Sequence, residues 1–176
     1  MRKTVSPLYT KVINLFNEHN PSTITEIRRL GIKAIKIGGG VFRNIYKIEK
    51  LPLVIKIPRL EADIPHSRAE YDAVQHCLNS RALKASYIRP YMPQIPYFNE
   101  ETGILLMEYV QPLNQTKTPK AVKNSIVGIL EDFIENVWPM SFDPTDNDIH
   151  SGNIGVNKYG QFKFIDLGYF LPDGRC

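Results

Sequence analysis

Hydrophobic positions recur at helical spacing near the start of the chain. They lie three or four residues apart and would share one helical face: Leu8, Val12, Leu15 and Phe16. Ser6 and Pro7 precede this stripe and suit a helix start, because serine caps and proline tolerates the first helical position. Asn20-Pro21 ends this helix. The segment 23–26 resembles a capping box for a short second helix that Gly31 would end.

From residue 32 onward the apolar residues form short runs of β-formers. The runs at 35–37, 42–48 and 53–55 predict three strands, with a glycine triplet between the first two. The following segment, from His66 to about Leu83, is expected to be helical.

The second half of the chain continues this alternation. Residues 95–99 and 104–110 predict two strands joined by a turn at 100–103, and Pro119 opens a long helix. The apolar stripe of that helix is Val122, Ile126, Ile129, Phe133 and Val137. The last elements are a polar loop and two strands around a turn: 143–153, 154–156, 157–160 and 162–165. This order of helices and strands indicates a mixed α+β fold.

Composition narrows the class of protein. The chain has 176 residues, of which 43% are hydrophobic and 23% are charged, so we expect one soluble globular domain. Its apolar runs, such as 104–107, are far shorter than the ~20 residues that span a membrane. The first seven residues lack the apolar stretch of a secretory signal. Having only two cysteines, Cys77 and Cys176, argues against a disulfide framework or a zinc cluster and favours a reducing, cytoplasmic location.

The net charge of +4 suits an anionic ligand such as a nucleotide. The basic residues are scattered along the sequence rather than massed in one stripe, so the charge does not favour nucleic-acid binding.

The most informative polar residues lie on two loops near the end of the chain. Asp148 and Asn153 share one loop, and Asp166 follows the last expected strand. Hairpin pairing of the two strands would bring Asn153 and Asp166 near each other. Carboxylate and carbonyl oxygens are the ligands that Mg²⁺ prefers, and Asp148 would reach toward an acceptor hydroxyl. Taken singly, Asp148 and Asn153 are also ordinary turn residues that cap their own backbone.

Gly38, Gly39 and Gly40 stand between two expected strands. A loop without β-carbons lets backbone N–H groups approach phosphate oxygens closely. The same triplet is compatible with a plain hairpin turn.

Lys56 is a charge in the otherwise apolar run 53–58. One interpretation places it on an edge strand with its ammonium in solvent, and the other buries it beside a carboxylate. Glu70 is the candidate partner because it lies on an apolar helical face, where an unpaired acid is costly. The apolar residues of that face are Val74, Cys77 and Leu78. Glu61, which precedes the helix, is the competing partner.

The segment 105–112 predicts a strand that runs into a proline-bounded linker. It is either an ordinary core strand or a hinge whose backbone pairs with a purine edge, with Met107 closing the pocket behind it.

In their order along the chain, these segments resemble those of the protein-kinase-like superfamily over residues 34–170. The resemblance implies that the following residues bind ATP: Gly38, Gly39, Gly40, Phe42, Ile45, Lys56, Met107, Glu108 and Val110. It implies catalytic roles for Asp148, Lys56 and Glu70, and Mg²⁺ binding by Asn153 and Asp166. The sequence of 148–153, Asp-Ile-His-Ser-Gly-Asn, is more similar to aminoglycoside and choline kinase-like relatives than to typical eukaryotic protein kinases.

The fold that the resemblance implies is a minimal protein-kinase-like one. We expect an N-terminal helical extension (1–31) of two helices, a β-rich N-lobe with one helix (32–110) and a truncated C-lobe (111–176). Arg43 departs from the family pattern at the third loop glycine, and Asp146 stands where a histidine often precedes the catalytic aspartate. The sequence ends ten residues after Asp166, without an activation segment. In this it is similar to minimal kinases of bacterial effectors and phages.

The implied function is transfer of the ATP γ-phosphate to a hydroxyl, that of a serine or threonine of a partner protein. The glycines would hold the phosphates, Lys56 oriented by Glu70 would bind the α and β oxygens, and Asp148 would accept the hydroxyl proton. Two alternatives stay open: a kinase-fold scaffold that binds a partner protein, and a small-molecule kinase.

Overall fold

The computed structural model describes residues 6–81, 83–136 and 151–167. The chain divides into two compact units, Met1–Ile64 with Ile95–Tyr109 and Pro65–Gln94 with Val110–Cys176. Each unit combines helices with an antiparallel sheet, which confirms the predicted α+β class. Within the described residues, no helix is both long and apolar enough to cross a membrane.

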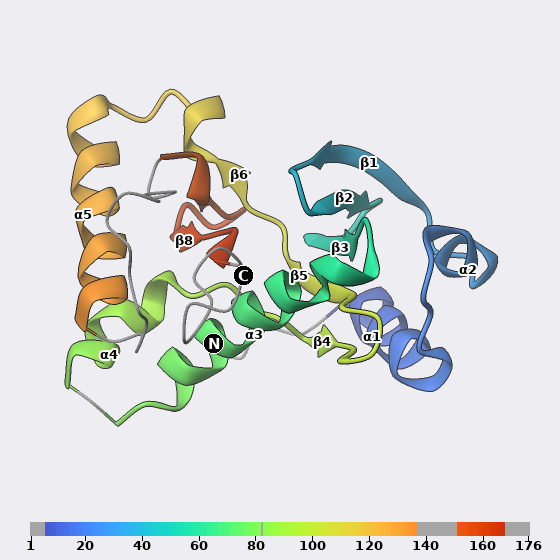
Figure 1. The fold of residues 1–176 in the computed structure, drawn as a ribbon. Helices are drawn as coiled ribbons and strands as arrows, with labels where there is room; N and C mark the ends of the chain where they lie inside the picture. The colour runs from blue at the N-terminus through green and yellow to red at the C-terminus, as the bar shows by residue number, and fades with distance from the viewer. Residues whose placement is uncertain (1–5, 82, 137–150, 168–176) are drawn as a thin grey trace. The chain divides into compact units, whose positions relative to one another are not determined.

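The sheet of the first unit has five strands in the order β1-β2-β3-β5-β4 (Figure 1). They are β1 (Ala34–Gly39), β2 (Arg43–Ile48), β3 (Leu53–Pro58), β4 (Tyr97–Phe98) and β5 (Leu105–Glu108). All neighbours pair antiparallel. β3 therefore lies in the interior of the sheet, between β2 and β5, while β1 and β4 form its edges.

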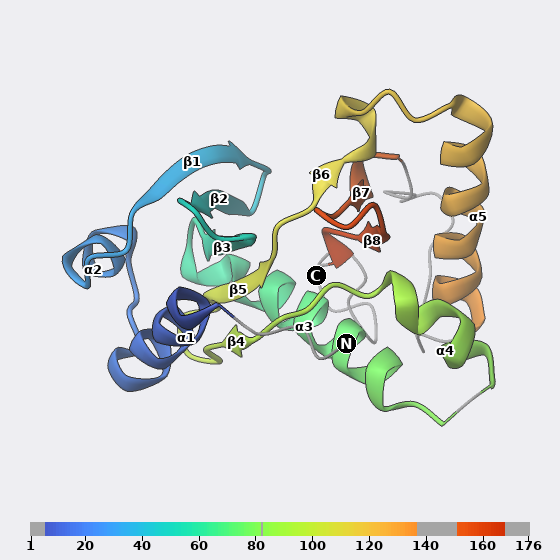
Figure 2. The same cartoon turned by 180° about the vertical axis from the view of Figure 1, so that it is seen from behind.

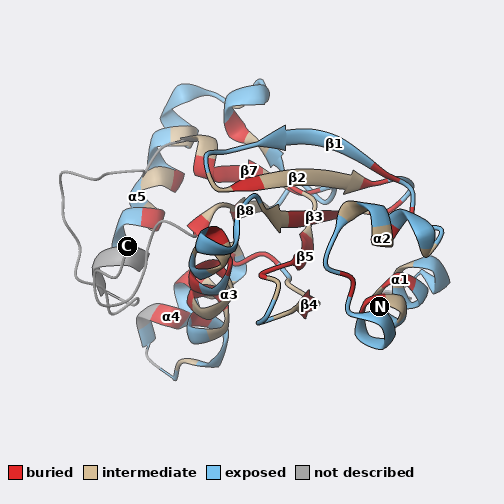
Figure 3. Ribbon diagram, turned by 45° about the vertical axis from the view of Figure 1, so that its right-hand side comes forward, coloured by how far each residue is buried: buried red, intermediate tan, exposed pale blue. Residues whose placement is uncertain are grey.

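One face of this sheet packs against α1 (Pro7–His19) and α2 (Ile24–Arg29). The helices contribute Val12, Phe16 and Ile27 to this core, and the strands contribute Ile48, Leu53, Ile55, Tyr97 and Leu106. The ring of Phe16 meets that of Tyr97 edge-on, with 5.1 Å between centroids. Figure 3 shows the same distribution, with burial concentrated in β3 and β5 and most of β1 exposed.

The two N-terminal helices begin and end close to where the sequence predicts, although the side chain of Ser6 makes no capping hydrogen bond. Pro7 occupies the first turn of α1, and Asn20 ends it in the left-handed conformation, with its N–H donating to the carbonyl of Phe16 at 2.9 Å. The Thr23 hydroxyl caps α2 by accepting the N–H of Glu26 at 3.2 Å. The Glu26 carboxylate in turn accepts the N–H of Ser22 at 2.7 Å, and this hydrogen bond is the main cause that lowers the pKa of Glu26.

In its described residues, the second unit contains a three-stranded sheet and three α-helices. Its strands, in the order β6-β7-β8, are β6 (Gln111–Pro112), β7 (Ile154–Val156) and β8 (Phe162–Phe164). Its α-helices are α3 (Ile64–Asn79), α4 (Leu83–Ile88) and α5 (Lys120–Asn136). Short 3-10 helices occur in both units: η1 (Glu61–Asp63), η2 (Arg89–Tyr91), η3 (Leu113–Gln115) and η4 (Ser151–Asn153).

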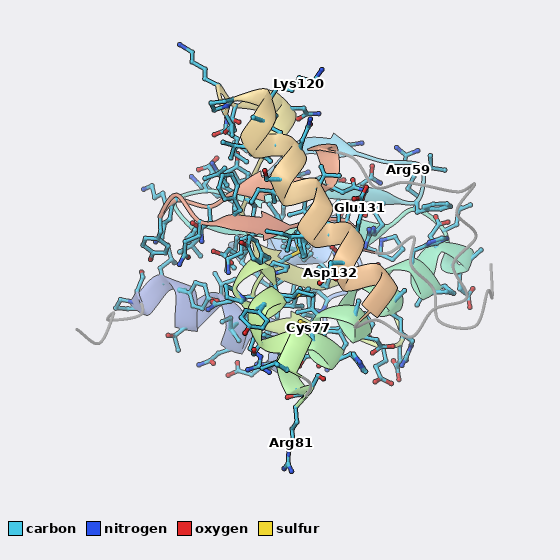
Figure 4. The ribbon with its side chains drawn as sticks, turned by 90° about the vertical axis from the view of Figure 1, so that its left-hand side faces the viewer. Arg59, Cys77, Arg81, Lys120, Glu131 and Asp132 are labelled. Atoms are coloured by element: carbon cyan, nitrogen blue, oxygen red, sulfur yellow. The ribbon has the colours of Figure 1, made fainter. Side chains whose placement is uncertain are left out.

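Several contacts join β8 to the segment that follows α4. The rings of Tyr91 and Phe164 stack with centroids 5.6 Å apart. The Lys163 ammonium donates to the carbonyls of Pro90 at 2.8 Å and Met92 at 3.0 Å. α4 lies beside α5, as Figures 1 and 2 show. Figure 4 looks onto α5, with Lys120 at its start and Glu131 and Asp132 further along its exposed surface.

Several predicted boundaries are wrong. The helix expected from His66 to about Leu83 ends at Asn79, and the separate helix α4 follows it, which the sequence analysis did not foresee. The strand expected at 95–99 shortens to Tyr97–Phe98, because Asn99 turns the chain by accepting the N–H groups of Glu101 and Thr102. Leu78, assigned to the apolar face of α3, is 38% exposed. Val137, at the end of the predicted α5 stripe, lies outside the described residues.

Candidate active site

The glycine triplet lies where β1 ends and turns into β2. The Gly40 N–H donates to the carbonyl of Arg43 at 3.0 Å, and the Phe42 carbonyl accepts the N–H of Arg59 at 2.9 Å. The turn is thus anchored to β2 on one side and to the end of β3 on the other. The predicted strand–turn–strand junction forms, but its position differs from the prediction: Gly38 and Gly39 belong to β1 and pair with β2, and only Gly40 lies in the turn.

The surroundings of the three glycines differ. A β-carbon on Gly38 or Gly40 would meet nothing within 4 Å, and neither residue has a positive φ. The fold itself therefore gives no steric reason for glycine at these two positions. Gly39 is crowded instead, since a β-carbon there would lie 3.2 Å from Nη2 of Arg59 and 3.3 Å from the carbonyl of Arg43. A guanidinium thus stands beside the turn, a group that the sequence analysis missed (Arg59 is labelled in Figure 4).

Lys56 is 2% exposed in the interior strand β3, so the edge-strand interpretation is wrong and the lysine is buried, while its pairing with a carboxylate stays a prediction. In the sheet register Lys56 lies opposite Ile45 of β2 on one side and opposite Leu105 of β5 on the other. Directly opposite residues of antiparallel strands place their side chains on the same face, with β-carbons about 5 Å apart. The pairing of the strands therefore places the Lys56 side chain between two apolar side chains, those of Ile45 and Leu105.

The same face of the sheet carries other predicted nucleotide-binding residues. Gly38 is opposite Ile45, and Met107 is opposite Val54, which is two residues before Lys56 and so shares its face. The α1 and α2 core lies on the other face, because Leu53, Ile55 and Leu106 alternate with these positions. The register therefore gathers Gly38, Ile45, Lys56 and Met107 on the face away from α1 and α2.

The predicted hinge lies at the end of β5. Glu108 is opposite Leu53, and the next N–H, that of Tyr109, donates to the carbonyl of Pro52 at 2.8 Å. Val110 is buried and is the first residue of the second unit after β5. Glu108 also lies near Tyr9 of α1. Burial is the main cause that raises the pKa of the Tyr9 phenol, and the Glu108 carboxylate adds to it.

In the second unit, the hairpin of β7 and β8 forms as predicted. Asn157 directs its turn, since the side-chain oxygen accepts the N–H groups of Tyr159 at 2.9 Å and Gln161 at 3.0 Å. At the open end, the N–H of Ile165 donates to the carbonyl of Asn153 at 2.7 Å. The backbone of Asn153 is thus paired with the residue before Asp166, and the expected proximity of these two loops is confirmed.

Asp166 has a backbone conformation that side chains rarely adopt, with a φ of 64°. Such residues cost roughly 1–3 kcal/mol and persist where their surroundings hold them. Here the holding group is Glu70 of α3, whose Oε1 accepts the N–H of Asp166 at 2.9 Å and that of Leu167 at 3.4 Å. Glu70 and Leu167 are fully buried. The sequence predicted that Glu70 is buried, but not that it binds this backbone.

Two side chains with oxygen donors, Asn153 and Asp166, lie at the open end of the β7–β8 hairpin. Asn153 is 4% exposed at the end of η4, and Asp166 is half-buried after β8. Asp148, the predicted catalytic residue, lies outside the described residues. Within residues 6–81, 83–136 and 151–167, no three or more His, Cys, Asp or Glu side chains are grouped to hold a metal ion.

The sequence matches no protein-family model and no curated protein. One solved structure that the chain is similar to is the ternary complex of streptomycin, ATP and the aminoglycoside phosphotransferase APH(2")-IIa, a member of the protein-kinase-like superfamily. The match covers 96% of this chain and 72% of that chain, with a TM-score of 0.46 and 11% sequence identity.

Proposed function

We propose that this protein is an ATP- and Mg²⁺-dependent phosphotransferase. The observation that carries the proposal is the geometry at the open end of the β7–β8 hairpin. Backbone pairing brings Asn153 next to the segment of Asp166, and the buried carboxylate of Glu70 holds Asp166 in a strained conformation. Strained residues fixed in this way are typical of functional sites.

The donor set fits Mg²⁺. The ion takes oxygen ligands, is commonly held by one or two carboxylates together with substrate phosphates, and keeps several waters. Asn153 would supply an amide oxygen and Asp166 a carboxylate oxygen. When bound there, Mg²⁺ would neutralise negative charge on the phosphate oxygens. The role of the protein is to hold the two side chains in place, which the hairpin and Glu70 accomplish through the backbone.

The first unit supplies groups suited to the nucleotide. The open space where a β-carbon of Gly38 or Gly40 would lie leaves room for a phosphate group beside the turn, and Arg59 adds a positive charge there. Lys56 presents its ammonium on the same face of the sheet as Gly38, Ile45 and Met107. We propose that Lys56 binds the α and β phosphate oxygens and that Ile45 and Met107 contact the base, with Phe42, Glu108 and Val110 completing the site. The Lys56–Glu70 ion pair stays a prediction.

Asp148 would orient the acceptor hydroxyl and accept its proton, the role that its position five residues before Asn153 implies. We propose a serine or threonine hydroxyl of a partner protein as the acceptor, with a small-molecule alcohol as the alternative. Radiolabelled ATP added to a lysate with the purified protein separates the two, because label transferred to protein supports the first and label on metabolites the second.

The first experiment is a melting scan with ATP, with and without Mg²⁺, followed by a turnover assay. A ligand that binds the folded chain raises its melting temperature, so the proposal expects a rise that needs both ATP and Mg²⁺. Asp166→Asn keeps a residue that tolerates the left-handed conformation and removes the charge. It should lower turnover by about 100-fold or more, whereas Asp132→Asn on the exposed surface of α5 serves as the control.

Full turnover in Asp166→Asn would overturn the metal assignment. A Mg²⁺-dependent rise in melting temperature without turnover, in lysate or alone, would replace the enzyme with a nucleotide-binding scaffold. No rise at all would contradict the proposed nucleotide site.

A further inference from the structure

A cavity of about 280 Å³ lies within the first unit, apart from the candidate active site. Three segments enclose it: one face of α1, the connection from α2 to β1, and the turn between β2 and β3. β1 runs from this cavity, near Ala34, toward the glycine turn at its other end. The cavity is therefore separated from Gly38–Gly40 by the length of a six-residue strand, which is about 20 Å.

Apolar side chains form the larger part of the cavity's lining. α1 contributes Leu8, Val12 and Leu15, and the sheet side contributes Ile32, Ile48 and Leu51. Val12, Ile32, Ile48 and Leu51 are buried, whereas Leu8 is 42% exposed and stands at the opening. An interior of this kind favours an alkyl or aromatic group over a polar one.

The charged residues that line the same cavity are mostly basic: Lys11, Lys33 and Lys50 against Glu49. All four are exposed. Within the part of the chain that the structure describes, none of the three ammonium groups forms an ion pair or a hydrogen bond. The opening thus carries an excess of positive charge above an apolar interior.

The backbone of Lys50, at the edge of this cavity, is in an uncommon conformation. Its φ is 62°, in the left-handed region that glycine and asparagine adopt at lower cost. Lys50 stands in the turn between β2 and β3, where a glycine would relieve the strain. Residues held in this conformation occur more often at functional sites than elsewhere.

We propose that this cavity binds a small amphipathic carboxylate. The apolar part of the ligand would occupy the space between α1 and the β2–β3 turn, and its carboxylate would lie among Lys11, Lys33 and Lys50. The volume is at the small end of the range for ligand sites, which suits a short acyl chain or a single ring. This binding site does not depend on the proposed phosphotransferase function.

The test compares three probes of equal chain length with the full-length protein: octanoate, octanol and octylammonium. Binding is measured by titration calorimetry and by the shift in melting temperature. The proposal expects octanoate to bind, octanol to bind about two- to fivefold more weakly, because a partly exposed ion pair contributes that much, and octylammonium to bind weakest. Equal binding of all three probes would overturn the recognition of an anion, and no binding by octanoate would overturn the site.

Variants separate recognition from folding. Lys50→Gly removes the ammonium and relieves the left-handed strain, so it should raise the melting temperature while weakening octanoate binding by about two- to fivefold. Lys36→Ala removes an exposed lysine of β1 that does not line the cavity, and it should leave octanoate binding unchanged. Octanoate binding that stays intact in Lys50→Gly, or falls equally in Lys36→Ala, would contradict the proposal.

A third variant tests the apolar interior. Leu8→Trp places a large ring at the opening, at a position exposed enough to accept it without disturbing the core. It should abolish octanoate binding while the melting temperature of the free protein stays close to that of the wild type. Undiminished binding in Leu8→Trp would show that octanoate binds elsewhere, for example between copies of the chain, and would overturn the assignment to this cavity.

Discussion

The Oε1 atom of Glu70 accepts the backbone N–H of Asp166 at 2.9 Å, across 96 positions of the sequence. The same oxygen lies 3.4 Å from the N–H of Leu167. A carboxylate on α3 thereby supplies the acceptor for two backbone N–H groups that follow β8. It links the orientation of the proposed metal-binding loop to the position of a helix.

Replacing Glu70 should therefore destabilise the fold as well as impair activity. Glu70→Ala leaves the N–H groups of Asp166 and Leu167 without this acceptor. We expect the free energy of unfolding to fall by about 2–4 kcal/mol. Glu70→Gln keeps an oxygen acceptor but loses the charge, so it should cost roughly half as much. Urea unfolding of the two variants measures the difference. If Glu70→Ala unfolds at the wild-type urea concentration, the hydrogen bonds to Asp166 and Leu167 contribute little.

Substitutions in the glycine turn should separate folding from nucleotide binding. Gly38→Ala and Gly40→Ala meet open space and should change the free energy of unfolding by less than about 0.5 kcal/mol. They should nevertheless weaken Mg-ATP binding, because the added methyl group lies where phosphate would approach. Gly39→Ala is the contrast, since its β-carbon crowds the carbonyl of Arg43 and should destabilise the turn. The checks are urea unfolding and calorimetric titration with Mg-ATP.

Cys77 should make stability depend on pH in the alkaline range. Burial raises the pKa of its thiol from 9.0 to about 11. The unfolded chain therefore loses this proton first, so stability is fully present below pH 9 and falls by roughly 2 kcal/mol by pH 11. Cys77→Ala should flatten this part of the profile of stability against pH.

A Cys176→Ser background leaves Cys77 as the remaining thiol, and a maleimide at pH 8 should label it only after denaturation.

Two glycines of the second unit should respond in opposite directions to alanine. A β-carbon on Gly155 would lie 2.5 Å from the carbonyl oxygen of Gln111 and 2.6 Å from Cγ1 of Val110, so Gly155→Ala forces β6 and β7 apart. We expect the free energy of unfolding to fall by about 2 kcal/mol or more.

Gly128 is exposed within α5, with its nearest neighbour 3.9 Å away, and Gly128→Ala should stabilise the chain by up to about 1 kcal/mol. Thermal unfolding should show a lower melting temperature for Gly155→Ala and a higher one for Gly128→Ala.

Sequence patterns predicted the elements whose signals are local. The helix start at Ser6-Pro7, the cap at Thr23 and the turn at Asn157–Gly160 depend on residues within a few positions of one another, and the structure forms each of them. The proximity of Asn153 and the Asp166 loop was also predictable, because a hairpin of known length fixes which residues meet at its open end.

The features that the sequence analysis missed depend on distant parts of the chain. Glu70 binds a backbone segment almost a hundred residues away, and helical periodicity reveals only that it is buried. Arg59 reaches the glycine turn because β2 and β3 pair, which a residue-by-residue analysis does not show. α4 was missed because its few buried residues, Ala85 and Ile88, make too short a pattern to distinguish from the end of α3.

The place of β5 beside β3 has a consequence for synthesis on the ribosome. β3 lies between β2 and β5, and Leu53 of β3 pairs with Glu108 of β5. Glu108 is synthesised more than fifty residues after Leu53, so β3 lacks this second neighbour during that interval. During that interval the nascent chain presents an unpaired, apolar β3, the kind of edge that recruits other strands. Nascent chains whose residues from 105 onward are still inside the ribosome should therefore engage chaperones or aggregate, and those in which Tyr109 has left the ribosome should not. Ribosome-bound chains of the two lengths, compared by chaperone crosslinking, measure this directly.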